Sequence, residues 1–258
     1  MKRKIIAIAN QKGGVGKTTT SINLSSSLAH FERRVLLIDM DPQANASRGL
    51  GLDSSVLKNT IFDAFFNGVD VNRIIKKTVM KNLDILPSSL VLSRMDVELS
   101  KREDHPYFML KNLLTNIKKS YDYMIIDCPP SLGMLSINAL VSADSVLIPV
   151  QCEYFALDAV AQVLSTIKQV QGEYNKTLGI EGFLLTMFDS RTRLGIEISQ
   201  EVRGLFKEST FLTQIPRNIS VAEASARGLP VNLFRPTSSG STAYFSLAKE
   251  IIEHEQAR

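Results

Sequence analysis

The sequence predicts an α/β fold built on a doubly wound, mostly parallel sheet with helices on both faces. Short apolar runs alternate with segments of helical periodicity along the chain. Several of these runs are apolar throughout, which is typical of parallel strands that are covered on both faces. This strand–helix alternation favours right-handed crossovers and an open, doubly wound sheet.

The individual elements follow from the same patterns. The apolar runs predict strands at 4–10, 35–41, 83–87, 123–128, 145–151 and 181–188, with shorter ones at 212–215 and 231–234. The periodic segments predict helices at 17–31, 107–120, 134–142, 155–171, 195–207 and 240–255. In 107–120, for example, Leu110, Leu113 and Leu114 share one helical face, and Lys111 falls off it.

Two further stretches need separate predictions. Ser220-Val-Ala-Glu223 has the spacing of a capping box and predicts the start of a short helix. The stretch 42–82 is the least regular part of the chain, and we expect a helical excursion over the sheet. Since no repeat, low-complexity tract or Pro/Gly-rich linker interrupts the pattern, we expect a single domain over 1–258.

Composition excludes several classes of protein. Apolar residues are 44% and charged residues 22%, which excludes a disordered chain or a disulfide-dense scaffold. The two cysteines, Cys128 and Cys152, are far apart and predict buried thiols in a reducing compartment. The apolar stretch 5–9 is too short for a secretion signal, and no run is long enough for a membrane span, so we expect a cytoplasmic protein. The net charge of +4 suggests an anionic partner.

The strongest motif is a glycine-rich loop between the first predicted strand and the first predicted helix. It consists of Lys12, Gly13, Gly14, Val15, Gly16, Lys17, Thr18 and Thr19. The glycines let successive backbone N–H groups turn toward phosphate oxygens, and the N-terminus of the next helix adds partial positive charge. Lys17 reaches the β- and γ-phosphates of a nucleotide in such a loop, and the Thr18 hydroxyl is a ligand for Mg²⁺.

One departure from the usual phosphate-loop pattern identifies a family. Position 11, where the first glycine is expected, is Gln11, and a second lysine, Lys12, opens the loop. KGGVGKTT resembles the deviant Walker A motif of the ParA/MinD ATPases, and DMDPQ (39–43) and IIDCPPSLG (125–133) resemble their second and third motifs. PVQCEYFALDA (149–159) and IPRN (215–218) resemble the ParA/Soj partition proteins, so the resemblance spans nearly the whole chain.

The resemblance implies a P-loop NTPase of the ParA/MinD type that binds ATP and Mg²⁺. Lys12 would reach across a homodimer interface to the phosphates held by the other subunit, so that ATP pairs the subunits. A second cation there would stabilise the charge that spreads over the γ-phosphate during hydrolysis. The implied activity is weak ATP hydrolysis, stimulated by a ParB-type partner.

Three carboxylates lie at or near the ends of predicted strands, at the edge where open α/β sheets bind ligands. The resemblance makes Asp41 the residue that orients the attacking water, while Asp39 would help to hold either the Mg²⁺ shell or the loop. Asp127 follows Ile125-Ile126 as a Walker B carboxylate does, and would hold Mg²⁺ and accept a hydrogen bond from Thr18. A role as a turn cap before Pro42 remains an alternative for Asp41 and Asp39.

Two sets of residues concern the adenine base and the cargo. The resemblance places Met187, Pro216, Arg217 and Asn218 beside adenine, although Pro216–Asn218 by themselves are equally consistent with a plain loop. It also implies non-specific binding of double-stranded DNA and a nucleoid-associated protein, with Arg191, Arg193, Arg227 and Lys249 as the candidate contacts. Where relatives often carry an arginine, this chain has Ser220.

The alternatives belong to other functional classes. In a MinD-like positioning ATPase, a basic amphipathic helix near the C-terminus binds the membrane, but the predicted helix here carries Glu250, Glu253 and Glu255, and we expect no membrane partner. A metal-cluster reductase or cluster-assembly ATPase needs clustered cysteines, which Cys128 and Cys152 do not supply. A small-molecule kinase using the same loop is the remaining alternative.

Overall fold

The protein forms one eight-stranded sheet that is parallel except at one edge. The computed structural model describes residues 3–99, 106–153 and 156–256. The strand order is β3-β4-β2-β5-β1-β6-β7-β8, and the β3–β4 pair is antiparallel. The strands are β1 (Lys4–Ile8), β2 (Val35–Asp39), β3 (Lys76–Lys77), β4 (Leu83–Leu86), β5 (Tyr123–Asp127), β6 (Ser145–Gln151), β7 (Gly179–Phe188) and β8 (Thr210–Pro216). The predicted doubly wound, mostly parallel fold is therefore confirmed.

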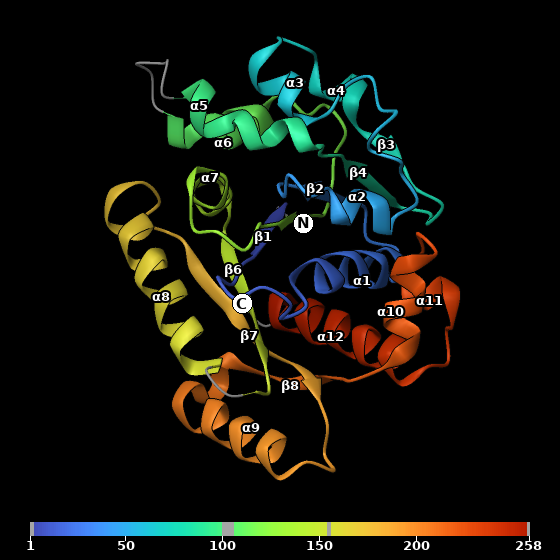
Figure 1. Ribbon diagram of the computed structural model, residues 1–258, viewed down its shortest axis with the longest axis vertical. Coiled ribbons are helices and arrows are strands. Elements are labelled where there is room, and N and C mark those ends of the chain that lie inside the picture. The colour runs from blue at the N-terminus through green and yellow to red at the C-terminus, as the bar shows by residue number, and fades with distance from the viewer. Residues whose placement is uncertain (1–2, 100–105, 154–155, 257–258) are drawn as a thin grey trace.

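Helices cover both faces of the sheet (Figure 1). One face carries α1 (Lys17–His30), α2 (Asn45–Gly49), α10 (Ile219–Ala226), α11 (Val231–Phe234) and α12 (Ser239–Gln256). The other carries α3 (Ile61–Phe66), α4 (Val71–Ile74), α5 (Met95–Leu99), α6 (Met109–Thr115), α7 (Met134–Ser142), α8 (Ala156–Glu173) and α9 (Arg193–Phe206). Short 3₁₀ turns lie at η1 (Leu90–Arg94), η2 (Pro106–Phe108) and η3 (Lys207–Ser209).

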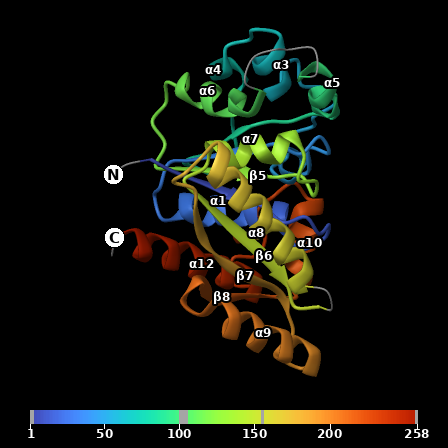
Figure 2. The same ribbon diagram turned by 90° about the vertical axis from the view of Figure 1, so that its left-hand side faces the viewer.

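The central strands explain the wholly apolar runs of the sequence. Every residue of β2 and β5 is buried, because a layer of helices covers each face. Strand register then places the ends of three strands together: Ile8 on β1 and Asp39 on β2 both pair with Asp127 on β5. Figure 2, in which the left-hand side of Figure 1 faces the viewer, shows α7 and α8 in front of the sheet, on the face opposite to α1 and α12.

Two predicted elements were wrong in type or length. The apolar run 231–234 is helix α11 rather than a strand: Pro230 precedes it, and the Val231 N–H donates to Asn23 Oδ1 of α1 at 2.8 Å. A four-residue apolar run does not distinguish strand from helix by itself. The helix predicted at 107–120 ends at Thr115, because the Asn72 side chain binds the Asn116 carbonyl and the Lys118 N–H and draws the chain out of the helix.

Smaller corrections concern the helix starts and the excursion. The short helix predicted at Ser220 is present as α10, but its capping box is wrong: α10 begins at Ile219 with Asn218 as its N-cap, and Ser220 is buried inside the helix. The excursion 42–82 contains three short helices and also the edge strand β3, which no pattern in the sequence predicted. Two helices there are capped by side chains: the Thr60 N–H donates to Asp63 Oδ2 at 2.7 Å before α3, and Asp70 Oδ1 accepts the Asn72 N–H at 2.9 Å before α4. The predicted helix start at 155 lies outside the described residues, and α8 is described from 156.

Candidate functional site

The glycine-rich loop connects β1 to α1 at the carboxyl edge of the sheet. Gly14 and Gly16 have φ angles of 78° and 89°, a left-handed conformation that side chains disfavour. A Cβ added at Gly13 or Gly14 would meet no atom within 4 Å, so the outer surface of the loop is open to a ligand. The loop is held from behind, because Val15 is buried and its carbonyl accepts a hydrogen bond of 2.8 Å from Thr186 Oγ1 on β7.

The lysines of this loop lie at its two ends. Lys17 begins α1, is 7% exposed, and donates from Nζ to the Lys12 carbonyl at 2.9 Å. Burial lowers the pKa of Lys17, while the nearby carboxylate of Asp127 opposes that shift. Lys12 is half-buried, and its N–H donates to Asn10 Oδ1 at 3.0 Å. Lys17 therefore places a largely desolvated cation beneath the open glycine loop.

Two carboxylates are buried next to this loop. Asp127 Oδ1 accepts a 2.8 Å hydrogen bond from Ser21 Oγ on α1, and Asp127 Oδ2 is buried with no hydrogen-bond partner among the described residues. The Asp39 carboxylate accepts from the Ser47 N–H at 2.8 Å and the Ser47 hydroxyl at 2.7 Å. Those two bonds reach Asp39 Oδ2, and Asp39 Oδ1 accepts the Asp41 N–H at 3.2 Å. Because both Asp39 oxygens already accept hydrogen bonds, the geometry favours the loop-holding role for Asp39.

The charges of Asp39 and Asp127 are buried close together, and a nearby cation would stabilise them. Burial raises the pKa of Asp127, and the negative charge of Asp39 raises it further, while the Ser21 and Thr18 hydroxyls act in the opposite direction. Burial also raises the pKa of Asp39, against the hydrogen bonds from Ser47. A buried carboxylate oxygen without a partner is costly unless a cation or donor compensates for it. Asp127, whose carboxylate also interacts with the Thr18 hydroxyl, therefore fits a Mg²⁺ ion.

Asp41 lies two residues beyond the end of β2, in a tight turn. Its carboxylate Oδ1 accepts the Gln43 N–H at 2.8 Å, and its carbonyl accepts the Ala44 N–H at 2.8 Å. Ala44 has a left-handed φ of 51°, which is unusual for a residue other than glycine. The turn role that the sequence left open is thus present, and it holds the Asp41 side chain at the edge of the sheet that carries the glycine loop.

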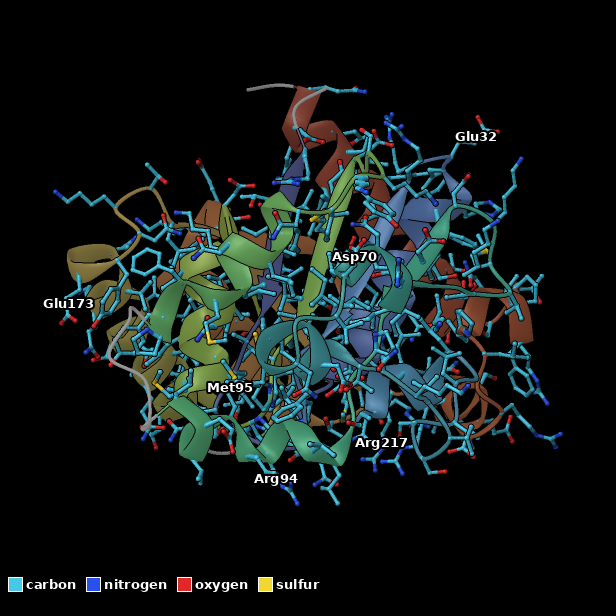
Figure 3. All side chains as sticks on the ribbon, turned by 90° about the horizontal axis from the view of Figure 1, so that it is seen from above. Glu32, Asp70, Arg94, Met95, Glu173 and Arg217 are labelled. Carbon is cyan, nitrogen blue, oxygen red and sulfur yellow. The ribbon has the colours of Figure 1, made fainter. Side chains whose placement is uncertain are left out.

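The four residues predicted to contact adenine come together in one pocket. Met187, Pro216, Arg217 and Asn218 line a cavity of about 300 Å³, together with Gly16 and Thr19 of the glycine loop and helix. The Asn218 side chain donates to Ser239 Oγ at 2.8 Å, and its Oδ1 has no partner within the described part of the chain. Figure 3, seen from above, shows Arg217 in the lower part of the view and Glu32 at the upper right, well separated from each other. Glu32 follows the C-terminal end of α1, whereas the N-terminal end of α1 belongs to the glycine loop.

This cavity is not the largest hollow of the described surface. One of about 830 Å³ lies beside Thr60, Phe66 and Arg94 and contains none of the motif residues. The 300 Å³ cavity is the better candidate for a base because it opens directly beside the glycine loop and its lining is mostly apolar. Contact of these residues with adenine stays a prediction.

The predicted DNA contacts are spread over three elements. Arg191 and Arg193 lie where β7 leads into α9, Arg227 follows α10, and Lys249 is on α12. Arg191 forms an ion pair with Asp189 at 2.7 Å, Arg193 forms one with Glu197 at 2.8 Å, and Lys249 Nζ lies 5.6 Å from the ring centre of Phe31. All four side chains are exposed, and the helices nearest to them pack on different faces of the sheet, α9 on one and α10 and α12 on the other.

Sequence reasoning missed three residues that support the site. Ser21 lies one helical turn after Lys17, so the phosphate-loop motif could have suggested it. Thr186 directly precedes the predicted Met187, yet its bond to Val15 crosses 171 positions. Ser47 follows Asp39 by eight positions with no local periodic signal. The hydrogen bonds of Thr186 and Ser47 therefore depend on the tertiary fold.

Comparisons with known proteins agree with this geometry. Residues 3–180 match the family model described as an AAA domain. The chain is 49% identical to the sporulation initiation inhibitor protein Soj of Bacillus subtilis (strain 168), covering 96% of this chain and 98% of Soj. It is 45% identical to the chromosome partitioning protein ParA of Myxococcus xanthus, covering 98% and 89% of the two chains.

A solved structure shares the whole fold. Cobyrinic acid a,c-diamide synthase from Mycobacterium smegmatis, with bound ATP analog and magnesium, superposes with a TM-score of 0.89 at 32% identity. The match covers 99% of this chain and 96% of that one. With a phosphate-loop fold, the deviant loop lysine and relatives that match over nearly their whole length, the chain belongs to the ParA/Soj family of partition ATPases.

Proposed function

We propose that this protein is an ATP-dependent switch that partitions chromosomes or plasmids. It binds ATP and Mg²⁺, forms a homodimer, holds double-stranded DNA without sequence preference, and hydrolyses ATP slowly until a ParB-type partner stimulates it. The observation that carries the proposal is the meeting of Lys17, Asp127 and Asp41 at the edge of the sheet that bears the open glycine loop, with Asp127 Oδ2 lacking a hydrogen-bond partner among the described residues. The whole chain acts as one ATPase domain.

Each part of the site has a role in this reaction. The N–H groups of residues 13–16 and the N-terminus of α1 bind phosphate oxygens, and Lys17 neutralises their charge. Thr18 and Asp127 hold Mg²⁺, which offsets the charge on the phosphates during hydrolysis. Asp41 accepts a hydrogen bond from the attacking water and orients it. Ser21 and Ser47 keep the two buried aspartates in place.

Dimerisation would link nucleotide binding to cargo binding. Lys12, the first residue of the loop, would contact the phosphates of a second subunit. The segment 183–235 holds seven Lys/Arg against five Asp/Glu, so each subunit carries only a small excess of positive charge. Pairing two subunits would double the phosphate contacts, and DNA affinity rises steeply with their number.

The direct test is DNA retention by the full chain with ATP, ADP or no nucleotide, at several salt concentrations. We expect retention with ATP alone, and a loss of retention as salt rises. Retention that is independent of nucleotide, or absent even at low salt, would refute the DNA-binding switch. Asp41→Ala should accumulate an ATP-bound dimer in size-exclusion chromatography, and Lys17→Ala should remain a monomer under the same conditions.

The MinD-like alternative makes a different prediction about α12. Its apolar residues Tyr244, Leu247, Ala248 and Ile251 are already buried against the sheet, and Glu250 accepts the N–H groups of Leu212 and Thr213 on β8. No helix within the described ranges is long and apolar enough to cross a bilayer. Pelleting with anionic liposomes and ATP distinguishes the alternatives, and we expect the protein to stay in the supernatant.

A further inference from the structure

Ser47 lies at the base of the loop that carries Asp41. It belongs to α2, is fully buried, and makes three hydrogen bonds through its N–H and its hydroxyl. Its N–H and its hydroxyl both donate to Asp39 Oδ2, at 2.8 and 2.7 Å. Its hydroxyl oxygen accepts the N–H of Ser88, just beyond β4, at 3.2 Å. Ser47 thus joins the ends of two neighbouring strands.

Asp39, held by Ser47, in turn holds the backbone of Asp41. The other carboxylate oxygen of Asp39, Oδ1, accepts the N–H of Asp41 at 3.2 Å. The chain therefore leaves β2 at Asp39, turns through Asp41 and the left-handed Ala44, and returns in α2 to the same carboxylate. The carboxylate of Asp39 closes this loop at its base, and Ser47 supplies two of the three hydrogen bonds that hold it.

A second tie on the outside of the loop is weaker. The Arg48 guanidinium donates to the Gln43 carbonyl at 2.8 Å and to Asn45 Oδ1 at 2.7 Å, but both bonds are exposed to solvent. A hydrogen bond from a buried hydroxyl to a buried carboxylate contributes more, because water cannot replace it when it is lost. The buried hydrogen bond from the Ser47 hydroxyl to Asp39 should therefore determine the position of the loop between these two residues.

We propose that Ser47 is a positioning residue for ATP hydrolysis: by fixing Asp39, it holds the Asp41 backbone so that the Asp41 carboxylate meets the attacking water. The proposal rests on the proposed function, in which Asp41 orients that water. It concerns the hydrolysis step and not nucleotide binding, since Ser47 is separate from the glycine loop and from the base pocket. Misplacement of a reacting group by about 1 Å can cost 10²-fold in rate.

The test compares Ser47→Ala with a matched control, Ser27→Ala. Ser27 is also a fully buried serine, but its hydroxyl has no hydrogen-bond partner within the described part of the chain. We expect Ser47→Ala to lower kcat by roughly 10- to 100-fold with KM for ATP within about threefold of the parent. Ser27→Ala should leave both constants unchanged. Ser47→Thr retains the hydroxyl and should keep most of the parent's kcat. Ser47→Cys, a weaker donor of similar size, should have a kcat between those of the parent and Ser47→Ala.

Hydrogen–deuterium exchange on the nucleotide-free protein gives a readout that does not depend on ATP hydrolysis. Peptides that cover 39–48 should exchange faster in Ser47→Ala than in the parent or in Ser27→Ala, since loss of the hydroxyl bond leaves the Asp39 carboxylate, which accepts the N–H groups of residues 41 and 47, less firmly held. Unchanged exchange and unchanged kcat in Ser47→Ala would overturn the proposal, as would an equal loss of kcat in Ser27→Ala. If the parent protein hydrolyses no ATP, the proposed function fails, and the exchange experiment still decides whether Ser47 holds the loop.

Discussion

Gly228 offers a sharp test of how tightly α2 packs against the end of α10. It has a left-handed φ of 66°, and a Cβ at this position would lie 2.8 Å from Gly51 Cα, 3.1 Å from Gly51 N and 3.3 Å from the Arg48 carbonyl oxygen. These are backbone atoms, which cannot rotate away as a side chain can. Gly68 has the same φ of 66°, but a Cβ there would meet no atom within 4 Å.

Comparing Gly68→Ala with Gly228→Ala separates the cost of backbone strain from the cost of packing in the free energy of unfolding. Gly→Ala in a left-handed conformation costs about 1–2 kcal/mol, and the accompanying loss of unfolded-chain entropy recovers about 0.4–1 kcal/mol. Both contributions apply equally to Gly68→Ala and Gly228→Ala and cancel in the comparison. Gly228→Ala must also move the backbone, at an overpacking cost of about 1–3 kcal/mol. We therefore expect Gly228→Ala to be the less stable variant by about 1–3 kcal/mol, or roughly 2–12 °C in Tm.

The measurement is urea unfolding followed by circular dichroism, since the chain contains no tryptophan to report by fluorescence. The m-values of the two variants should agree, so that the midpoints report stability directly. Equal free energies of unfolding for Gly68→Ala and Gly228→Ala would refute the tight approach of Gly228 to Gly51. A thermal melt of each variant provides an independent check on the difference.

Three other predictions follow from the site. Thr186→Val leaves the buried Val15 carbonyl unpaired and should lower the free energy of unfolding by about 1–3 kcal/mol; Thr186→Ser, which keeps the hydroxyl, should lose less of it in the same denaturation experiment. Because the pKa of Asp127 is raised by burial, the folded state binds its proton more tightly than the unfolded state, so metal-free protein should lose stability as pH rises from about 4 toward that raised pKa. In urea titrations over this pH range, the free energy of unfolding of Asp127→Asn should depend less on pH than that of the parent. The same variant should need more Mg²⁺ for ATP hydrolysis, and an unchanged Mg²⁺ requirement would count against Asp127 as a ligand. Changing Arg191 and Arg193 to Ala should reduce the salt dependence of ATP-dependent DNA retention by about 1 in logarithmic slope for each arginine that contacts a phosphate, whereas an unaltered slope would place the DNA elsewhere.

Much of the fold could be predicted because its signals are local. Strands such as Val35–Asp39 and Tyr123–Asp127 are apolar throughout, which is what burial on both faces requires. The glycine loop was equally clear, because left-handed backbone at Gly14 and Gly16 needs glycine and the helix N-terminus must follow directly. Errors arose where a distant side chain decides the outcome: Asn23 helps to turn 231–234 into a helix, and Asn72 ends the helix that begins at Met109.

The sequence by itself determined which residues can do the chemistry: a phosphate loop with two lysines, and aspartates at or just beyond the ends of strands. The tertiary structure alone decided how those residues are held. Strand register pairs Asp39 with Asp127, Thr186 fastens the glycine loop from 171 positions away, and Ser47 closes the turn around Asp41. The physical reason is that a buried polar group must find its partner in space, and its partner's position in the chain carries no periodic signal.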